Sequence, residues 1–207
     1  MVILNDLAQQ LQLDDPEERR TISGVSWAQY ESLLADLGDG SPYCVAYLDG
    51  VLEIVSPSRR HETGKTRIGT LLEIYFLEKE TEYFPAGSTT LRQAGQQAGA
   101  EPDESYCIGV DKPIPDLVIE VVVTSGGINR LEVYRRLGVS EVWFWQNDQI
   151  AIYHLRQEQV FTQTFGYEAI PQSEVLPNLD MNLLVASVCN PNPLAAAKAF
   201  RQAVRQD

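Results

Sequence analysis

Apolar residues at helical spacing predict several amphipathic helices. One apolar stripe runs from residue 27 to residue 37, where Ser26 can cap the start of the helix and Gly38 can end it. A longer helix is expected to open at Ser56-Pro57-Ser58 and to run to about Lys79. The other expected helices lie at about 1–13, at about 129–137 and in the tail from Pro193.

Short apolar or alternating runs predict strands between these helices. Tyr43–Leu48 and Val51–Val55 are joined by Asp49-Gly50, which is a strong hairpin signal. The run DLVIEVVV at 116–123 is almost wholly apolar, as is typical of a central strand that is covered on both faces. Further strands are expected near 82–92, 101–108, 141–145, 149–155 and 160–165, and residues 93–100 are expected to form a loop.

The order of these elements predicts a mixed α/β fold with a central mixed sheet flanked by helices. The strand at 116–123, the helix after it and the strand at 141–145 form one βαβ crossover. Residues 14–24 begin with Asp14-Asp15-Pro16 and are predicted to be a linker. Residues 1–24 would then be an N-terminal extension, and residues 25–207 a single domain with its core at about 43–155, followed by a C-terminal meander and helix.

The composition excludes several classes of protein. The 207 residues carry 16 basic and 29 acidic side chains, so the net charge of −13 lacks the basic footprint common in nucleic-acid binders. No apolar run approaches the ~18–20 residues that span a bilayer, and the N-terminus does not resemble a signal peptide. The three cysteines are widely spaced, which favours free thiols in a reducing compartment. We therefore expect a cytoplasmic protein that does not enter a membrane.

Glu120 is the most informative residue, because it lies within the apolar strand at 116–123. A carboxylate is costly to bury unless it reaches solvent, binds a cation, pairs with a base or stays protonated. Asp116 cannot share an ion with Glu120, because four strand residues separate the two by ~13 Å. Asp103 can, because it starts the preceding strand and neighbouring strands lie only ~4.8 Å apart. The two carboxylates could then hold one hard cation such as Mg²⁺, although EPDE at 101–104 could equally be a solvated acidic turn.

Glu62 is a third acidic candidate, in the first turn of the long helix. Its position is also explained by the helix dipole, which stabilises an anion at the N-terminus. Four basic residues surround it and could contact phosphates or simply form a solvated helix face: Arg59, Arg60, Lys65 and Arg67.

Other catalytic motifs are weak or absent from the sequence. His61 and His154 are the only histidines, and neither has a partner at metal-ligand spacing. There is no G-x-S-x-G elbow, no P-loop and no dinucleotide-binding fingerprint. Trp27, Trp143 and Trp145 are better explained as core residues than as platforms for base stacking.

Five segments in order resemble the Uma-two family of restriction-endonuclease-like proteins, which is similar to nucleases of the PD-(D/E)XK superfamily. These segments cover roughly residues 43–155 and read LDGVLEIVSPSRRHE, GSTTL, AEPDESYCI, PDLVIEVVVTS and LEVYRRLGVSEVWFW. The resemblance implies a restriction-endonuclease-like central mixed sheet flanked by helices. It also implies a Mg²⁺ site, which could accept Mn²⁺, on two neighbouring strands and a nearby helix.

The resemblance also assigns roles to individual residues. The superfamily aspartate falls on Asp103, the first acidic residue of the (D/E)XK element on Glu120 and the helical acidic residue on Glu62. The superfamily lysine would stand at Val122, whereas family members carry a lysine in the following helix, where this chain has Arg130. Arginine can stabilise phosphate charge but cannot act as a base at neutral pH.

Three functions remain open at this point. The leading hypothesis is a Mg²⁺-dependent endonuclease that hydrolyses DNA, with Asp103, Glu120 and Glu62 on the metal, Glu62 as an alternative water-orienting base, and Arg130 stabilising charge. The second is a catalytically inactive nuclease-like fold that serves as a nucleic-acid or protein binding module. The third, and the weakest, is a hydrolase that uses serine or histidine. The apolar terminal segments could mediate a homodimer.

Overall fold

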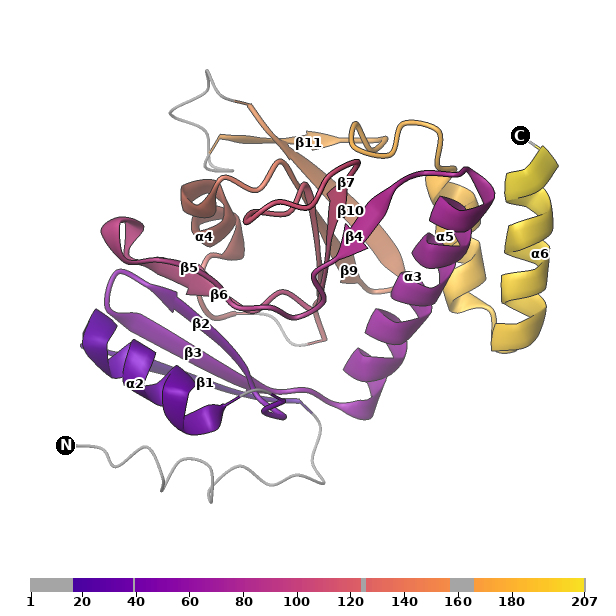
Figure 1. Ribbon diagram of the computed structural model, residues 1–207. Coiled ribbons are helices and arrows are strands. Elements are labelled where there is room, and N and C mark those ends of the chain that lie inside the picture. The colour runs from indigo at the N-terminus through magenta and orange to yellow at the C-terminus, as the bar shows by residue number, and fades with distance from the viewer. Residues whose placement is uncertain (1–16, 39, 124–125, 157–165, 207) are drawn as a thin grey trace.

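Two β-sheets form the framework of the protein. The computed structural model describes residues 17–38, 40–123, 126–156 and 166–206. The five-stranded sheet has the order β1-β3-β2-β6-β5, and the six-stranded sheet has the order β11-β10-β9-β8-β7-β4 (Figure 1). The strands of the five-stranded sheet are β1 (Glu18–Ser23), β2 (Cys44–Leu48), β3 (Val51–Ser56), β5 (Leu91–Gln93) and β6 (Ala98–Ala100).

The six-stranded sheet is mixed. Its strands are β4 (Tyr83–Pro85), β7 (Glu104–Ile108), β8 (Leu117–Val121), β9 (Glu141–Gln146), β10 (Gln149–Leu155) and β11 (Tyr167–Ile170). β8 and β9 are parallel, as the crossover through α4 (Arg130–Leu137) requires, and the other neighbours are antiparallel. All five residues of β8 are buried, in agreement with its apolar sequence.

Helices cover both faces of the six-stranded sheet. α3 (Arg59–Glu78), α5 (Met181–Cys189) and α6 (Pro193–Gln206) pack together on one face, against a core that includes Ile119 and Trp143 (Figure 1). α4 covers the other face, where Val133 and Tyr134 pack on Val118. The same cluster includes Ala98 and Ala100 of β6, so α4 lies between the two sheets.

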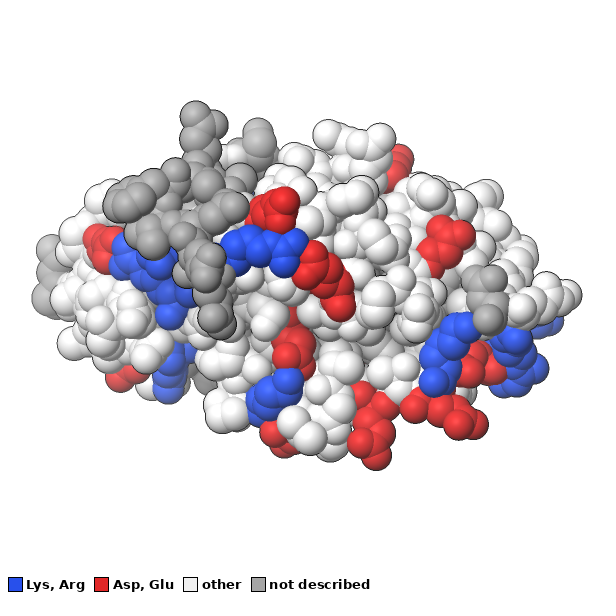
Figure 2. All heavy atoms as spheres, turned by 90° about the horizontal axis from the view of Figure 1, so that it is seen from above, with Lys and Arg blue, Asp and Glu red and all other residues white. Residues whose placement is uncertain are grey.

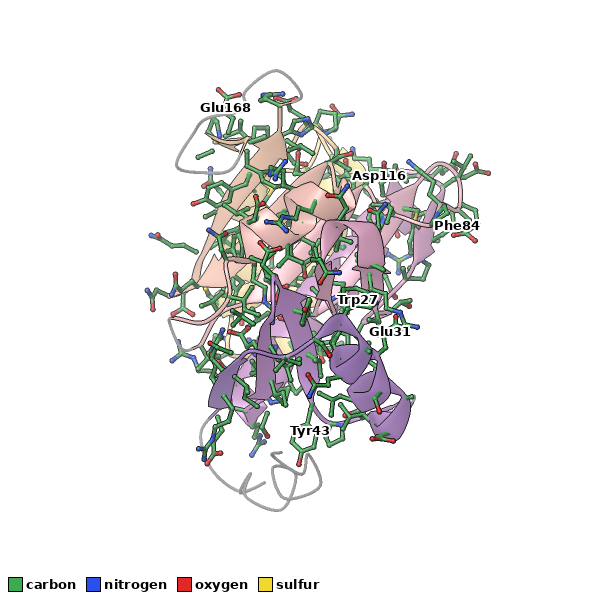
Figure 3. All side chains as sticks on the ribbon, turned by 90° about the vertical axis from the view of Figure 1, so that its left-hand side faces the viewer. Trp27, Glu31, Tyr43, Phe84, Asp116 and Glu168 are labelled. Carbon is green, nitrogen blue, oxygen red and sulfur yellow. The ribbon has the colours of Figure 1, made fainter. Side chains whose placement is uncertain are left out.

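α2 (Trp27–Leu37) covers the five-stranded sheet and buries Tyr30 and Leu33 against it. Ser26 and Gln29 form a capping box at its N-terminus, and the backbone N–H of Gly38 closes its C-terminus on Leu34. Trp27 contacts Tyr30 and Tyr47 edge-on, and Figure 3 shows it beside the small sheet. Trp143 and Trp145 are buried in the main core, so the prediction of core tryptophans is confirmed.

Several sequence predictions differ from the structure. Residues 18–23, predicted to be part of a linker, form β1, which pairs with all six residues of β3. The single strand predicted at 82–92 is two short strands, β4 and β5, in different sheets. The loop predicted at 93–100 contains a short 3₁₀ helix (Ala94–Gln96) and β6, and α5 was not predicted.

β11 was not predicted either, and most of the remaining elements follow the sequence predictions. The Asp49-Gly50 hairpin, the long helix α3, the βαβ unit and the C-terminal helix are all present. Asp116 accepts a hydrogen bond from the Ile108 backbone N–H and pairs with Lys112, so its carboxylate has a structural role of its own. The helix predicted at 1–13 and the strand predicted at 160–165 lie outside the described residues.

Candidate metal and phosphate site

Asp103, which directly precedes β7, lies beside Glu120 on the neighbouring strand β8. β7 and β8 are antiparallel with Glu104 opposite Ile119, so one further step places Asp103 opposite Glu120. The backbone N–H of Val121 donates to Asp103 Oδ2 at 2.6 Å, which fixes the two strand ends together. Both side chains are buried and line the same cavity of about 240 Å³. This volume has room for several water molecules.

Asp103 also belongs to a buried chain of three side chains. His61 Nε2 lies 2.8 Å from Asp103 Oδ1, and His61 Nδ1 lies 2.8 Å from Glu17 Oε2. Ser58 caps α3 through the backbone N–H of His61, which holds this residue at the start of the helix. Burial lowers the pKa of His61, but the hydrogen bonds to Asp103 and Glu17 outweigh burial and raise its pKa to about 10. His61 is therefore a cation at neutral pH, with a carboxylate on each side.

Glu120 has a hydroxyl group and a guanidinium group as neighbours. The hydroxyl of Tyr134, on α4, donates a short hydrogen bond to Glu120 Oε1. Arg130 Nη1 lies 3.8 Å from the same oxygen, too far for a hydrogen bond. Burial raises the pKa of Glu120 to about 7; the neighbouring Asp103 charge acts in the same direction, whereas Arg130 opposes it. Burial disfavours the charge on Arg130, but Glu120, Tyr134 and Glu53 outweigh it and raise the pKa of Arg130 above its ordinary value.

A second buried carboxylate, Glu53 on β3, holds Arg130. Arg130 Nη2 donates to Glu53 Oε1 at 3.0 Å. Glu53 Oε2 accepts from Arg19 Nη1 and from the Ile128 backbone N–H, both at 3.0 Å. Arg19, His61 and Arg130 therefore bring three cations to the wall of a cavity that Asp103 and Glu120 also line.

The position at which the resemblance implies a lysine lies on the same cavity. Val122 follows β8 directly and lines the cavity together with Arg130. Arg130 comes from α4, whose start at Asn129 is capped by the Asn129 side chain on Glu132 N–H. Arg130 therefore brings a cation from α4 to the cavity that Val122 lines at the end of β8.

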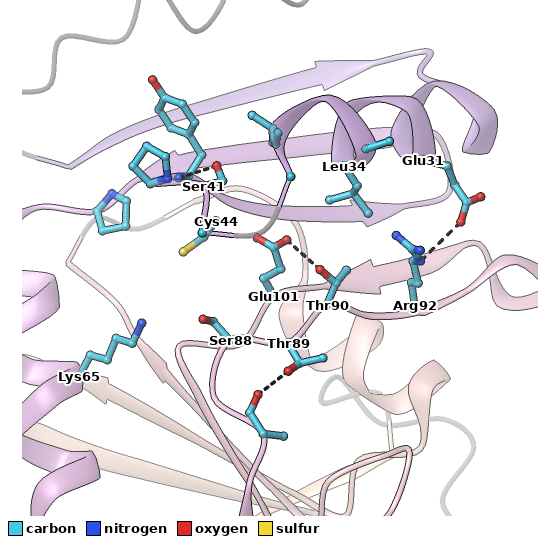
Figure 4. Close-up of a pocket in the computed structure, with 18 of the residues that line it drawn as sticks. Glu31, Leu34, Ser41, Cys44, Lys65, Ser88, Thr89, Thr90, Arg92 and Glu101 are labelled. Carbon is cyan, nitrogen blue, oxygen red and sulfur yellow. Dashed lines mark hydrogen bonds and ion pairs between the residues drawn. The ribbon is translucent and has the colours of Figure 1, made fainter.

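Glu62 lies elsewhere. It is exposed on α3 and does not line the cavity of Asp103 and Glu120. It borders a larger cavity of about 1240 Å³ between α2, α3 and the loop before β5, which Figure 4 shows with Lys65 and Glu101 on its walls. The residue next to it, His61, is the one that contacts Asp103.

The two carboxylates are enough for a divalent cation that keeps part of its water shell. Within the described residues no group of three or more His, Cys, Asp or Glu side chains is arranged to hold a metal ion. Mg²⁺ is commonly held by only one or two carboxylates, with waters completing its shell. Asp103 and Glu120, which line one cavity, suit this smaller requirement, and each is held by a neighbour: Asp103 by His61 and Glu120 by Tyr134.

Sequence reasoning proposed Asp103, Glu120 and Arg130, which line one cavity, but missed their partners. Glu53 carries the same signal as Glu120, since both are single carboxylates inside apolar strands. His61 and Tyr134 carry no such signal, because their partners lie 42 and 14 residues away along the chain.

A comparison with protein families identifies the chain. The family model Uma2, described as "Putative restriction endonuclease", matches residues 27–185. The chain belongs to the Uma2 family. The predicted restriction-endonuclease-like fold is confirmed by this match together with the mixed sheet between helical layers.

Solved structures also match this Uma2 chain. One solved structure, described as a "putative nuclease belonging to DUF820" from Anabaena variabilis ATCC 29413, is 13% identical and has a TM-score of 0.48. The match covers 74% of this chain and 96% of that one. No curated protein matches the chain.

The surface of this Uma2 protein has mixed charge. On the face in Figure 2, lysine and arginine side chains lie beside aspartate and glutamate side chains and form no broad basic patch among the described residues. Among all the described residues, no helix is both long enough and apolar enough to cross a bilayer.

Proposed function

We propose that this chain is a divalent-metal-dependent nuclease that hydrolyses phosphodiester bonds of DNA. The observation that carries the proposal is the juxtaposition of Asp103 and Glu120 across β7 and β8, on one cavity with Arg130. Family membership supports the nuclease chemistry. Mg²⁺ or Mn²⁺ is the cation that suits two carboxylate ligands.

Each residue of the site has a distinct part in this proposal. Asp103 and Glu120 would hold the cation, which supplies a Lewis acid and a bound water of lowered pKa when present. Arg130 Nη1 is buried and has no hydrogen-bond partner in the described part of the chain, so it can donate to a phosphate oxygen. The guanidinium group then stabilises the negative charge that develops there during hydrolysis. His61 and Tyr134 orient the two carboxylates and do not touch the substrate. Glu62 is left out of the ligand set, because it borders the other cavity.

Cleavage of supercoiled plasmid tests the proposal. We expect cleavage by the wild-type chain in Mg²⁺ or Mn²⁺ and none in EDTA. Asp103→Asn and Glu120→Gln should each reduce the rate by at least ~10²-fold, because each removes a charged ligand. Glu168→Gln is the matched control, since Glu168 is an exposed glutamate on β11 that pairs with Arg156 and does not line the cavity (Figure 3). Equal cleavage by all four proteins would reject the roles of Asp103 and Glu120.

A second candidate function has its own support. Asp103 already contacts His61, and Glu120 already contacts Tyr134 and lies near Arg130. A site whose acids are satisfied by the protein itself could serve only as a nuclease-like binding module. Folded wild-type chain that binds DNA but never cleaves it, in any divalent metal, would favour this alternative.

A further inference from the structure

Arg130 is restrained beside Glu120 without being bonded to it. Its Nη2 donates to Glu53 Oε1 at 3.0 Å, whereas its Nη1 stops 3.8 Å from Glu120 Oε1. A buried guanidinium next to a carboxylate gains most from a close, charge-assisted pair at about 2.7–2.9 Å. Nη1 instead has no hydrogen-bond partner among the described residues. A contact elsewhere in the fold therefore keeps Arg130 from forming a close ion pair with Glu120.

Glu53 is itself held rigidly enough to do this. Its side chain is fully buried, and Oε2 accepts hydrogen bonds from both Arg19 Nη1 and the Ile128 backbone N–H. The backbone of Gly127 closes over it, since a Cβ at that position would lie 1.6 Å from Glu53 Oε2. Glu53 therefore cannot follow Arg130 toward Glu120 without breaking contacts with β1 and with the loop before α4.

We propose that Glu53 is a positioning residue that holds Arg130 off Glu120. The restraint keeps Arg130 Nη1 available for a phosphate oxygen and keeps the Glu120 carboxylate available for a divalent cation. The identity of these two ligands rests on the proposed function, but the restraint is a property of the fold alone. Without Glu53, Arg130 would pair with Glu120, and both groups would be lost to the substrate and the cation.

The crystal structure of Glu53→Gln tests the restraint directly. Glutamine has one acceptor oxygen where glutamate has two, and it carries no charge. It therefore cannot accept hydrogen bonds from Arg130, Arg19 and the Ile128 backbone N–H at the same time. We expect an Arg130 nitrogen within about 3.2 Å of a Glu120 oxygen. An Arg130 that stays where it is in the wild type would overturn the proposal. If Glu53→Gln does not fold, Glu53→Asp, which keeps the charge and shortens the side chain, is subjected to the same test.

Calorimetric titration with Mn²⁺ supplies a readout that does not depend on catalysis. Glu53→Gln should weaken Mn²⁺ binding by about 10- to 100-fold, as loss of a residue that orients a ligand commonly does. Arg130→Ala in the same chain should restore most of the affinity, because the competing cation is gone. A purely structural role for Glu53 predicts no such restoration, and a double variant as weak as Glu53→Gln would contradict the proposal.

Glu132→Gln is the matched control for this titration. Glu132 also binds two arginines, Arg135 and Arg136, but it does not line the cavity. Its substitution should leave Mn²⁺ affinity unchanged. If the wild-type chain binds no Mn²⁺, the proposed function fails, and the position of Arg130 in the Glu53→Gln crystal still decides the restraint.

Discussion

Gly127 packs directly against Glu53, the residue that holds Arg130. Its φ is +97°, and a Cβ added there would lie only 1.6 Å from Glu53 Oε2, so there is no room for a side chain. Gly127→Ala should therefore displace Glu53 and lower the free energy of unfolding by about 3 kcal/mol or more, since backbone strain adds to the loss of a buried ionic network. Urea unfolding followed by fluorescence measures this.

Gly126→Ala distinguishes the effect of backbone strain from the effect of the contact with Glu53. Gly126 has a similar φ of +106°, but a Cβ there would meet nothing within 4 Å. We expect a loss of only about 1–2 kcal/mol, because strain acts alone. Equal losses in the two variants would show that the approach to Glu53 is unimportant.

Val122 and Arg130 line one cavity, which makes an exchange between them testable. Arg130→Ala should slow DNA cleavage by about 10²–10³-fold, as removal of a single charge-stabilising donor commonly does. Adding Val122→Lys to that variant returns a cation to the cavity from the strand. We expect the double variant to cleave faster than Arg130→Ala in a plasmid assay, whereas Val122→Met, which is long but uncharged, should not. Identical rates for the lysine and methionine variants would contradict a role for positive charge.

At the scale of elements, the sequence predicted those whose signals are local. Ser26 and Gln29 cap α2, Asp49-Gly50 turns the hairpin, and the apolar run of β8 marks its central position. The missed elements depend on distant partners. β1 is rich in charge because it is an edge strand, and β6 contains a glycine because Gly99 packs closely under Tyr30. α5 is mostly apolar, and it packs against α3, α6 and β10.

The residues of the candidate site also divide into those with local signals and those that depend on distant partners. The pairing of Asp103 with Glu120 could be predicted, because adjacent strands bring their ends together. The contact of His61 with Asp103, and that of Glu53 with Arg130, could not, because each joins different elements across the fold.

α6 offers a prediction about stability. Phe200 is fully buried against α3 and α5, whereas Leu194 on the same helix is 65% exposed. Phe200→Ala should lower the free energy of unfolding by about 3–5 kcal/mol, from lost burial and the cavity that remains. Leu194→Ala should change it by less than about 0.5 kcal/mol. Thermal or urea unfolding of both variants compares them, and similar losses would mean that α6 is not docked as described.

At the scale of the whole molecule, the charge of −13 opposes binding to DNA. No broad basic patch of described residues offsets it on the face shown in Figure 2. We therefore expect DNA affinity to depend on a divalent cation, which neutralises Asp103 and Glu120 and bridges to phosphate.

Fluorescence anisotropy of a labelled duplex tests this dependence. Binding should be at least tenfold tighter in Ca²⁺ than in EDTA, a difference of about 1.4 kcal/mol, and the gain should vanish in Glu120→Gln. Equal affinity with and without the cation would place DNA binding outside this cavity.

The central claim is that Asp103 and Glu120 together hold one divalent cation, and calorimetric titration with Mn²⁺ tests it most directly. The wild-type chain should bind one Mn²⁺ with heat that saturates at millimolar metal or below, and Asp103→Asn and Glu120→Gln should each abolish that binding while remaining folded. Absence of binding by the wild type, or unchanged binding by the two variants, would contradict the claim.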